Sequence, residues 1–481
     1  MNDDEFMVNS KLTCEYIKEY NEKLRKNLLP VAPSHELKPG YLQSLLPERA
    51  PDQGEHFKDV IKDLDKLIMP GVTQWHHPDF YGYYPTAKTY ESLLGDMISG
   101  AIASIGFSWI SCPASTELEV IMIDWLVMAM NLPDFYLSKS TSGGGIIQTS
   151  ASISSAMVIL GLRSRQFRDN LVPENVQGQF ADRLVVYFSE EAHSSVERAC
   201  RIALVQLRAI QTRNSGNHGM DVEKLKEQIL LDLNAGLIPL AVVGALGTTG
   251  SCAFDDLEEI GKLCREMNIW LHVDAAYFGC GLFCPEYHYL AKGIEYADSF
   301  NFNLHKIGLV IFDCSILLMR DKSVLVDSFI VNPQYLNNDN SLMPEYRHWD
   351  INLGRRFRSL KIWFVLRCYG VSGCQKAIRK HTMLAGKFAE LIRKDNSFEI
   401  VNQVDFGLVC FRAKGSDDLN RKLYEMIEKE RRIFLVTSSY KTHEKVDEKF
   451  FLRLTPSCAT EEENISFAFQ YIKSLLELIK S

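Results

Sequence analysis

From about residue 86 to residue 378, two patterns of apolar residues follow each other in turn along the chain. Short runs of consecutive apolar residues predict buried strands, and the stretches between them, with apolar residues every three to four positions, predict helices. The strands are expected at 184–188, 240–245, 269–273, near 298–302 and over 308–319. Strands that alternate with helices form a mostly parallel sheet, so the pattern predicts an α/β fold with short loops between its elements.

The pattern is different at the two ends of the chain. Residues 1–85 contain two amphipathic helical stretches, the second at about 54–68, and a proline-bearing extended stretch between them, which predicts an arm that wraps another surface. Beyond residue 379, helices and alternating strands predict an α+β domain, with elements at 381–394, 406–411, 450–454 and 461–479. The expected organisation is an N-terminal helical arm (1–85), a large domain (86–378) and a small C-terminal domain (379–481).

Composition and charge narrow the class of protein. The 481 residues are 46% hydrophobic and 24% charged, which is typical of a globular protein with more than one domain. A net charge of −8, without a long basic run, argues against nucleic acid or an anionic membrane as the partner. The acidic start MNDDEFMVNSKL and the lack of an apolar run of ~20 residues predict a soluble cytoplasmic protein. Twelve scattered cysteines without a CxxC pair predict no metal site.

Residues whose side chains could take part in catalysis or binding follow several of the predicted strands. In an open, mostly parallel sheet, ligands bind at the carboxyl ends of the strands. Histidine, aspartate and threonine side chains follow three apolar runs, at His193, Asp274 and Thr249. Lys306 lies within the otherwise apolar stretch NFNLHKIGLVIF, where a charged ammonium would be costly to bury. Upstream, the segment 142–152 contains three successive glycines and is expected to open a helix.

Each of these residues also has an ordinary structural explanation. A histidine at a strand end is often merely hydrogen bonded, an aspartate there often caps a helix, glycines usually mark turns, and a lysine usually reaches water. Together, they match the needs of a pyridoxal phosphate enzyme. Lys306 would bind the cofactor, Asp274 would keep its pyridine nitrogen protonated, and His193 would cover its ring. The 142–152 loop and the helix after it would hold the phosphate.

Motifs along almost the whole chain resemble one enzyme family. They are PGYLQSLLPERAP, IMPGVTQWHHPDFYGYYPTAKTY, IGFSWISCPASTELEVIMIDWL, EEAHSSVERA, LGTTGSCAFD, WLHVDAAYFG, GIEYADSFNFNLHK and RHWDINLGRRFRSLKIWFVLRCYG. On these motifs the chain resembles the group II pyridoxal phosphate-dependent decarboxylases, in particular the animal aromatic-L-amino-acid (DOPA) decarboxylase and histidine decarboxylase subgroup. The resemblance implies a fold type I, aminotransferase-like architecture around a seven-stranded-type sheet. It also implies pyridoxal 5'-phosphate as the cofactor and an obligate homodimer with active sites at the subunit interface.

The resemblance also implies roles for individual residues. Lys306 would carry the cofactor, Asp274 would pair with its ring nitrogen and His193 would stack on its ring, while Tyr335, in a mobile loop at about 328–345, would help to protonate the product. The other cofactor-binding residues implied are Ala151, Ser152, Thr249, Ala276, Asn303 and His305. The substrate-binding residues implied are Trp75, Tyr83, Tyr84, Pro85, Thr86 and Gly354, with Ile105 and Phe107 reaching across from the other subunit.

Two positions bear on the substrate. Histidine decarboxylases of the family have serine where this chain has Gly354, and they lack the threonine found here as Thr86. The resemblance therefore implies decarboxylation of a catechol or phenol-type amino acid, namely L-DOPA, tyrosine or 5-hydroxytryptophan, to the amine and carbon dioxide. Histidine decarboxylation is a less favoured alternative.

An aromatic aldehyde synthase, which uses dioxygen and releases aldehyde, ammonia and hydrogen peroxide, is the main alternative. Tyr84 replaces the usual phenylalanine of the decarboxylases, and Leu304 replaces the usual proline, whereas the retained His193 and Tyr335 favour the plain decarboxylase. Ile307 and Ile153 are further departures from the family pattern. A binding or scaffolding protein that has lost its chemistry is disfavoured, because such a relic would be expected to lose buried charged groups that are costly without a cofactor.

Overall fold

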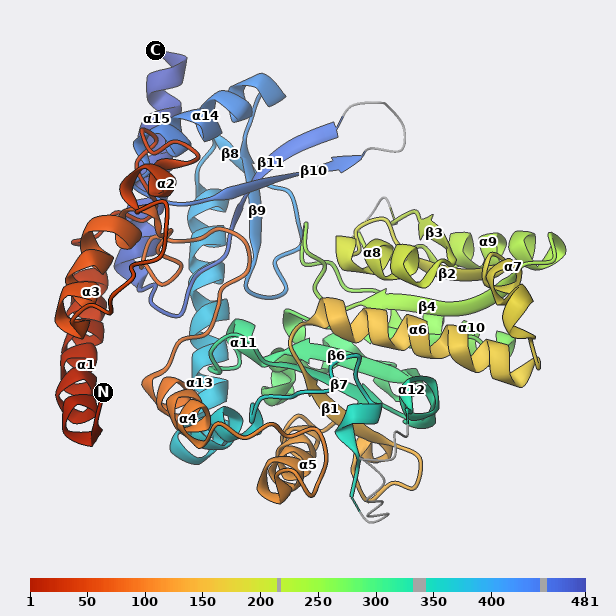
Figure 1. Cartoon of the computed structure of the whole chain (residues 1–481). Coiled ribbons are helices and arrows are strands. Elements are labelled where there is room, and N and C mark those ends of the chain that lie inside the picture. Colours follow the sequence, from red (N-terminus) through yellow and green to blue (C-terminus); the bar gives the residue numbers. More distant parts are fainter. Residues whose placement is uncertain (214–217, 332–342, 442–447) are drawn as a thin grey trace.

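A seven-stranded sheet forms the centre of the molecule (Figure 1). The computed structural model describes residues 1–213, 218–331, 343–441 and 448–481. The strands lie in the order β1-β7-β6-β5-β4-β2-β3. Their bounds are β1 Gly144–Gln148, β2 Leu184–Ser189, β3 Gln206–Ile210, β4 Ile238–Ala245, β5 Trp270–Asp274, β6 Ser299–Asn303 and β7 Ser315–Met319. β7 runs opposite to the other six strands, so the prediction of a mostly parallel α/β sheet is confirmed.

The strands of this sheet are buried on both faces. Along β2, Leu184, Val186 and Phe188 belong to one apolar cluster, whereas Val185 and Tyr187 belong to another. Successive side chains of a strand point to opposite faces, so a strand covered on both sides is apolar at every position. This explains why continuous apolar runs, rather than alternating ones, mark these strands in the sequence.

Helices cover both faces of the sheet. The helices of the large domain are α4 Tyr90–Ile102, α5 Pro113–Ala129, α6 Ala151–Asp169, α7 Gln177–Ala181, α8 Ser194–Ala203, α9 Val222–Asn234, α10 Leu257–Met267, α11 Leu304–Ile307 and α12 Ser323–Phe329. Side chains of α6, α8 and α12 pack in one cluster, and side chains of α5, α9 and α10 pack in the other. The sheet is therefore the middle layer of three.

A smaller antiparallel sheet lies in the C-terminal part of the chain (Figure 1). Its order is β10-β11-β9-β8, with β8 Phe398–Ile400, β9 Val409–Ala413, β10 Val436–Lys441 and β11 Glu448–Leu454. The helices packed with it are α13 Ser359–Lys394, α14 Asp417–Glu430 and α15 Glu462–Lys480. Because α13 runs through the predicted boundary at residue 378 and links the two sheets, the domain limits remain a prediction.

The N-terminal residues form α1 Asp3–Arg25, α2 Tyr41–Leu45 and α3 Phe57–Asp63, followed by a π-helical turn at Leu64–Ile68. The Tyr16 hydroxyl donates to Asp65 Oδ1 over 2.8 Å and so joins α1 to this turn. Beyond the arm, the ring of Phe80 stacks on Phe434 near the small sheet. No helix among the described residues combines the length and the hydrophobicity that crossing a membrane requires.

Three local predictions were wrong. Residues 308–314 are not a strand, and only the second half of the run 308–319 forms one, as β7. The glycines within 142–152 do not form a loop that opens a helix; Gly144 and Gly145 lie in β1, and the helix begins only at Ala151. The strand expected at 406–411 begins later, at Val409–Ala413. The helix expected at 381–394 is confirmed, as the last part of α13.

Candidate active site

Asp274 is the last residue of β5 and is held from two sides. Its Oδ1 atom accepts a hydrogen bond from Asn301 Nδ2 on β6 over 3.0 Å and one from the Ala276 N–H over 3.0 Å. Asp274 and Asn301 face each other in the register of the two strands. The carboxylate is therefore fixed at the carboxyl edge of the sheet, where parallel α/β sheets bind ligands.

Lys306 lies in the four-residue helix α11, directly after β6. Burial lowers the pKa of its amine to about 8, although the nearby Asp274 carboxylate acts in the opposite direction. Its Nζ atom lies 5.0 Å from the centre of the Tyr84 ring. A lowered pKa makes a larger fraction of the amine neutral near physiological pH, and the neutral amine is the nucleophilic form.

His193 is the N-cap of α8, and its ring orientation is set by that position. Its Nδ1 atom lies 3.1 Å from the Ser195 N–H, which donates to it, and 2.8 Å from Ser195 Oγ. Burial lowers the pKa of His193, Asp274 raises it and Lys306 lowers it further. Because the backbone N–H can only donate, Nδ1 is an acceptor, and the neutral ring carries its hydrogen on Nε2.

Polar groups that suit a phosphate lie at the ends of β1 and β6. Ser150 caps α6 and accepts from the Ile153 N–H, which leaves the first N–H groups of α6, those of Ala151 and Ser152, without acceptors inside the helix. Among the described residues, Asn303 Oδ1 and both amide atoms of Gln148 are buried without a hydrogen-bond partner. The free N–H groups of Ala151 and Ser152 at the helix N-terminus, together with the Gln148 Nε2 donor, fit an anionic group such as the phosphate of pyridoxal phosphate, whereas the two amide oxygens can only accept hydrogen bonds.

The other predicted cofactor residues lie around this edge. The Ala276 carbonyl accepts from the Asn303 N–H over 3.1 Å. His305 follows β6, and its Nδ1 atom lies 3.0 Å from the Cys314 N–H. Burial lowers the pKa of His305 to about 4, so its ring is neutral. Thr249 follows Gly247, whose φ of +83° is a conformation that glycine adopts without strain.

The residues predicted to bind the substrate form two groups. In the first, the Trp75 and Tyr83 rings stack with centres 5.1 Å apart, and Thr86 Oγ1 lies 3.2 Å from His76 Nε2. Pro85 lies between Tyr84 and Thr86 in the chain. In the second group, the Gly106 N–H donates to the Arg355 carbonyl over 3.0 Å, which brings the segment of Ile105 and Phe107 beside Gly354. The Ile105 side chain is 58% exposed in the single chain.

Tyr84 belongs to the cofactor side rather than to an open pocket wall. It is buried, and its ring stacks on Tyr277 with the centres 3.7 Å apart. Its hydroxyl donates to the Thr248 carbonyl over 2.6 Å. The hydroxyl that distinguishes Tyr84 from a phenylalanine is therefore already bound to the backbone, while the ring faces Lys306. Tyr335 lies outside the described residues.

Sequence reasoning missed two groups that the fold adds to this site. Arg453 of β11 lies with its guanidinium carbon 5.5 Å from the centre of the Tyr84 ring, and its Nε and Nη2 atoms are buried without a partner among the described residues. Asn301 orients Asp274. Both are polar residues inside apolar strands, in FFLRL and SFNFN, and this was the signal that could have revealed them.

Comparison with known proteins agrees with this arrangement. Residues 39–414 match the model of the pyridoxal-dependent decarboxylase conserved domain. The chain belongs to this family. It is 44% identical to the aromatic-L-amino-acid decarboxylase of Rattus norvegicus over 482 residues, which cover 99% of this chain and 98% of the relative. The family, the enzyme class and the cofactor predicted from the sequence are therefore confirmed: the chain is a pyridoxal phosphate-dependent decarboxylase.

Two solved structures show the same fold at full length. Oryza sativa TDC with PLP and tryptamine superposes with a TM-score of 0.94 and 31% identity, covering 100% of this chain and 99% of the other. Rhodiola rosea 4-hydroxyphenylacetaldehyde synthase superposes with a TM-score of 0.91 and 32% identity, covering 100% of each chain. Because a protein named as an aldehyde synthase has this fold, the fold alone does not decide the reaction.

Proposed function

We propose that this protein converts an aromatic L-amino acid, such as L-DOPA, tyrosine or 5-hydroxytryptophan, to its amine and carbon dioxide. The observation that carries this proposal is the placement of the Lys306 amine, with its lowered pKa, beside the Asp274 carboxylate and the His193 ring at one sheet edge. Similarity to the rat aromatic-L-amino-acid decarboxylase supports the substrate class. The roles of the individual residues are part of the proposal.

The chain's residues hold the reactants and move the proton. Pyridoxal phosphate, when bound, supplies a ring that accepts the electron pair left by the departing carbon dioxide. Lys306 would hold the cofactor through its amine. Asp274, fixed by Asn301 and the Ala276 N–H, keeps the ring nitrogen protonated. Ala151, Ser152, Asn303 and His305 hold the phosphate end, while Thr249 and Ala276 border the ring.

Protonation at the α-carbon distinguishes an amine-forming enzyme from an aldehyde synthase. His193, with its hydrogen on Nε2, covers the ring face and can donate at the α-carbon. Tyr335 is proposed as the second proton donor. A supply of protons in a site that excludes water and dioxygen favours the amine over oxidation.

The aromatic side chain of the substrate is proposed to lie against Trp75 and Tyr83, near Pro85 and Thr86. Gly354 lies next to Ile105, since a Cβ atom on Gly354 would be 3.4 Å from Ile105 Cγ2. Ile105, Phe107 and Gly354 would complete the pocket of the second subunit in a homodimer. The exposure of Ile105 supports this arrangement.

Exposed apolar residues support the homodimer. On α4, Leu94, Met97, Ile98 and Ile102 are exposed and recur at the spacing of one helix face. On α5, Ile121, Trp125 and Met128 do the same. Apolar faces of this size usually pack against another protein. Sedimentation of the holoenzyme is expected to give a dimer, and Ile98→Glu is expected to weaken it.

An aldehyde synthase is the second candidate. Tyr84 and Leu304 favour it, as does the likeness to the Rhodiola rosea enzyme. The bonding of the Tyr84 hydroxyl to Thr248 weakens this argument, because that hydroxyl is held by the backbone.

A product assay in air separates the candidates. The holoenzyme is incubated separately with L-DOPA, tyrosine, 5-hydroxytryptophan and histidine, and amine, aldehyde and hydrogen peroxide are measured together. The proposal predicts amine from at least one aromatic substrate with little peroxide. Equal amounts of aldehyde and peroxide would identify an aldehyde synthase, and amine from histidine alone would identify a histidine decarboxylase. Turnover of none of the four would contradict the proposal.

A further inference from the structure

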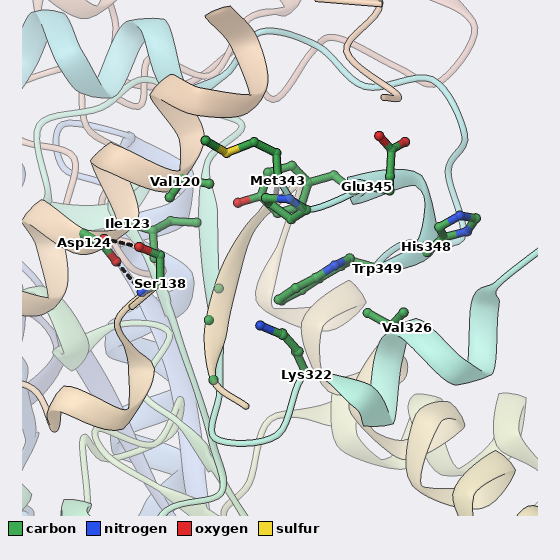
Figure 2. Close-up of a pocket in the computed structure, with 15 residues that line it drawn as sticks. Val120, Ile123, Asp124, Ser138, Lys322, Val326, Met343, Glu345, His348 and Trp349 are labelled. Carbon is green, nitrogen blue, oxygen red and sulfur yellow. Dashed lines mark hydrogen bonds between the residues drawn. The ribbon is translucent and has the colours of Figure 1, made fainter. Parts of the chain in front are cut away.

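A second pocket lies beside the glycines of β1, away from the candidate active site. It has a volume of about 390 Å³ and lies between α5, the start of β1, the start of α12 and the segment 343–349 (Figure 2). Active-site residues follow the other end of β1, after Gln148. At ~3.3 Å per residue, the strand separates Gly144 from Gln148 by about 13 Å.

The glycines of β1 form one wall of the pocket because other groups approach their backbone closely. A Cβ atom on Gly144 would lie 3.0 Å from Cη2 of Trp349, and one on Gly145 would lie 2.9 Å from Cγ2 of Ile123. The sequence pattern assigned the Gly triplet to a phosphate-binding loop. In the structure its glycines instead allow close packing. This packing brings the indole of Trp349 and helix α5 against a bare strand.

The outer edge of β1 also presents peptide groups to this pocket. At Ile147 the N–H donates to Glu119 Oε1, and the carbonyl accepts from Arg355 Nη2. In an antiparallel pair, residues two apart direct their peptide groups to the same side. The peptide groups of Gly145 therefore point to the same outer edge as those of Ile147, and Gly145 lines the pocket.

The charged groups that line the pocket are the carboxylates of Asp124 and Glu345 and the ammonium of Lys322. Asp124 is already engaged, because it accepts from both the N–H and the hydroxyl of Ser138. Glu345 accepts from the Trp109 N–H and lies 3.5 Å from Arg347. By contrast, Lys322 forms no ion pair or side-chain hydrogen bond with the residues that the structure describes, and Figure 2 shows its ammonium extending into the pocket near Trp349.

Aromatic and aliphatic side chains provide the remaining walls. Tyr346 and Trp349 form an edge-on pair with ring centres 5.7 Å apart, and Val120 and Val326 line the pocket with them. Apolar walls with a few polar groups, in a volume of this size, are typical of sites for small molecules.

We propose that this pocket binds a small aromatic carboxylate, with its ring against Trp349 and its carboxylate paired with Lys322. A free ammonium beside an indole in a largely apolar pocket complements both parts of such a molecule. The proposal does not depend on which substrate the active site takes.

Calorimetry with the holoenzyme tests the proposal. The probes are indole-3-acetate, which has no amino group to react at the cofactor, and its uncharged analogue indole-3-acetamide. Lys322→Met removes the ammonium, and Val326→Phe fills the pocket. Lys226→Met, on the exposed side of α9, is the matched control.

Indole-3-acetate is expected to bind the wild type and Lys226→Met equally. It is expected to bind Lys322→Met at least ~10-fold more weakly, because the charge-assisted hydrogen bond is lost, and not to bind Val326→Phe. Indole-3-acetamide is expected to bind the wild type as weakly as the acetate binds Lys322→Met. The absorption of the bound cofactor is expected to stay unchanged during the titration. Equal affinity of Lys322→Met and wild type, or wild-type affinity in Val326→Phe, would overturn the proposal by placing the ligand elsewhere, the active site included. Lack of binding to the wild type would overturn it as well.

Discussion

Two lysines, Lys361 and the half-buried Lys306, are surrounded very differently. Lys361, on α13, is 1% exposed, and its Nζ atom lies 3.6 Å from Asp96 and 3.9 Å from Asp313. Lys306 forms no ion pair with the residues that the structure describes, and its Nζ atom lies 5.0 Å from the centre of the Tyr84 ring. Burying an ammonium is costly unless carboxylates surround it.

The difference distinguishes a charged lysine that stabilises the fold from a lysine whose amine is available to react. Around Lys361, two arginines join the same carboxylates: Arg358 donates to Asp313 over 2.9 Å, and Arg356 to Asp96 over 3.0 Å. That network stabilises the charged lysine and connects α4, α13 and the loop before β7. Lys306 lacks such a network, so its amine loses its proton more easily and is available to react.

Replacement of Lys306 by alanine is expected to have the largest effect on activity. Removing a group that forms a covalent bond lowers kcat by roughly 10³-fold or more. Thermal stability is expected to stay the same or rise, because an unpaired buried amine is lost. Amine release and thermal melting of the variant check both statements. Retention of more than about a tenth of the activity would show that Lys306 is not the cofactor lysine.

Replacement of Lys361 by methionine is expected to show the opposite pattern. It leaves Asp96 and Asp313 with one cation fewer, while Arg356 and Arg358 remain bound to them, so the expected loss of stability is roughly 1–3 kcal/mol. Denaturant unfolding is expected to show this loss, while the folded variant still attaches the cofactor. A variant of unchanged stability would mean that the network does not need Lys361.

Replacement of Asp274 by asparagine tests the carboxylate that is proposed to act beside Lys306, and it is expected to lower kcat. The change removes the negative charge but keeps the size of the side chain, and loss of one such electrostatic contact lowers kcat by about 10²–10³-fold. Asp256→Asn is the matched control, since Asp256 caps α10 and asparagine caps equally well. The kcat of both variants is measured with saturating cofactor. Equal kcat values in the two variants would exclude a role for Asp274 at the ring nitrogen.

The smallest expected effect concerns the pH dependence of stability in the cofactor-free protein. Burial depresses the pKa of Lys306 to about 8 in the folded state, below its ordinary value of 10.5. Between these two values the unfolded chain binds more protons at this residue, so stability rises with pH in this range. Well below pH 8, the amine is protonated in both states and the cost of the buried ammonium is fully present.

The measurement is the denaturant midpoint of the apoprotein at pH 7.5 and 9.5, for wild type and Lys306→Met. The wild type is expected to gain stability relative to the variant at the higher pH. A constant difference between the two proteins would show that the amine titrates normally in the fold.

The sequence predicted the parts of the fold that depend on local patterns. β2, β4 and β5 are buried on both faces, and their apolar runs reveal them directly. The run 308–319 misled for a physical reason: Leu309 and Val310 are buried but lie in a loop, and Leu309 has a φ of +64°. Buried loops and buried strands have the same apolar composition, so periodicity does not separate them.

The site was predictable where one residue type is required by the chemistry. Lys306, Asp274 and His193 each follow a strand, and parallel topology brings such positions together. Arg453 was not predictable in this way, because its position beside Tyr84 depends on how the small sheet packs against the large domain. The same holds for Gly144, whose need for a bare backbone comes from Trp349, about 200 residues later in the chain.

The most direct test of this account is to locate the lysine that carries the cofactor. The holoenzyme is reduced with borohydride, digested and analysed by mass spectrometry. The account predicts that the pyridoxyl group is found on the peptide that contains Lys306 and on no other. Its presence on Lys361, Lys322 or any other lysine would contradict the assignment of the active site.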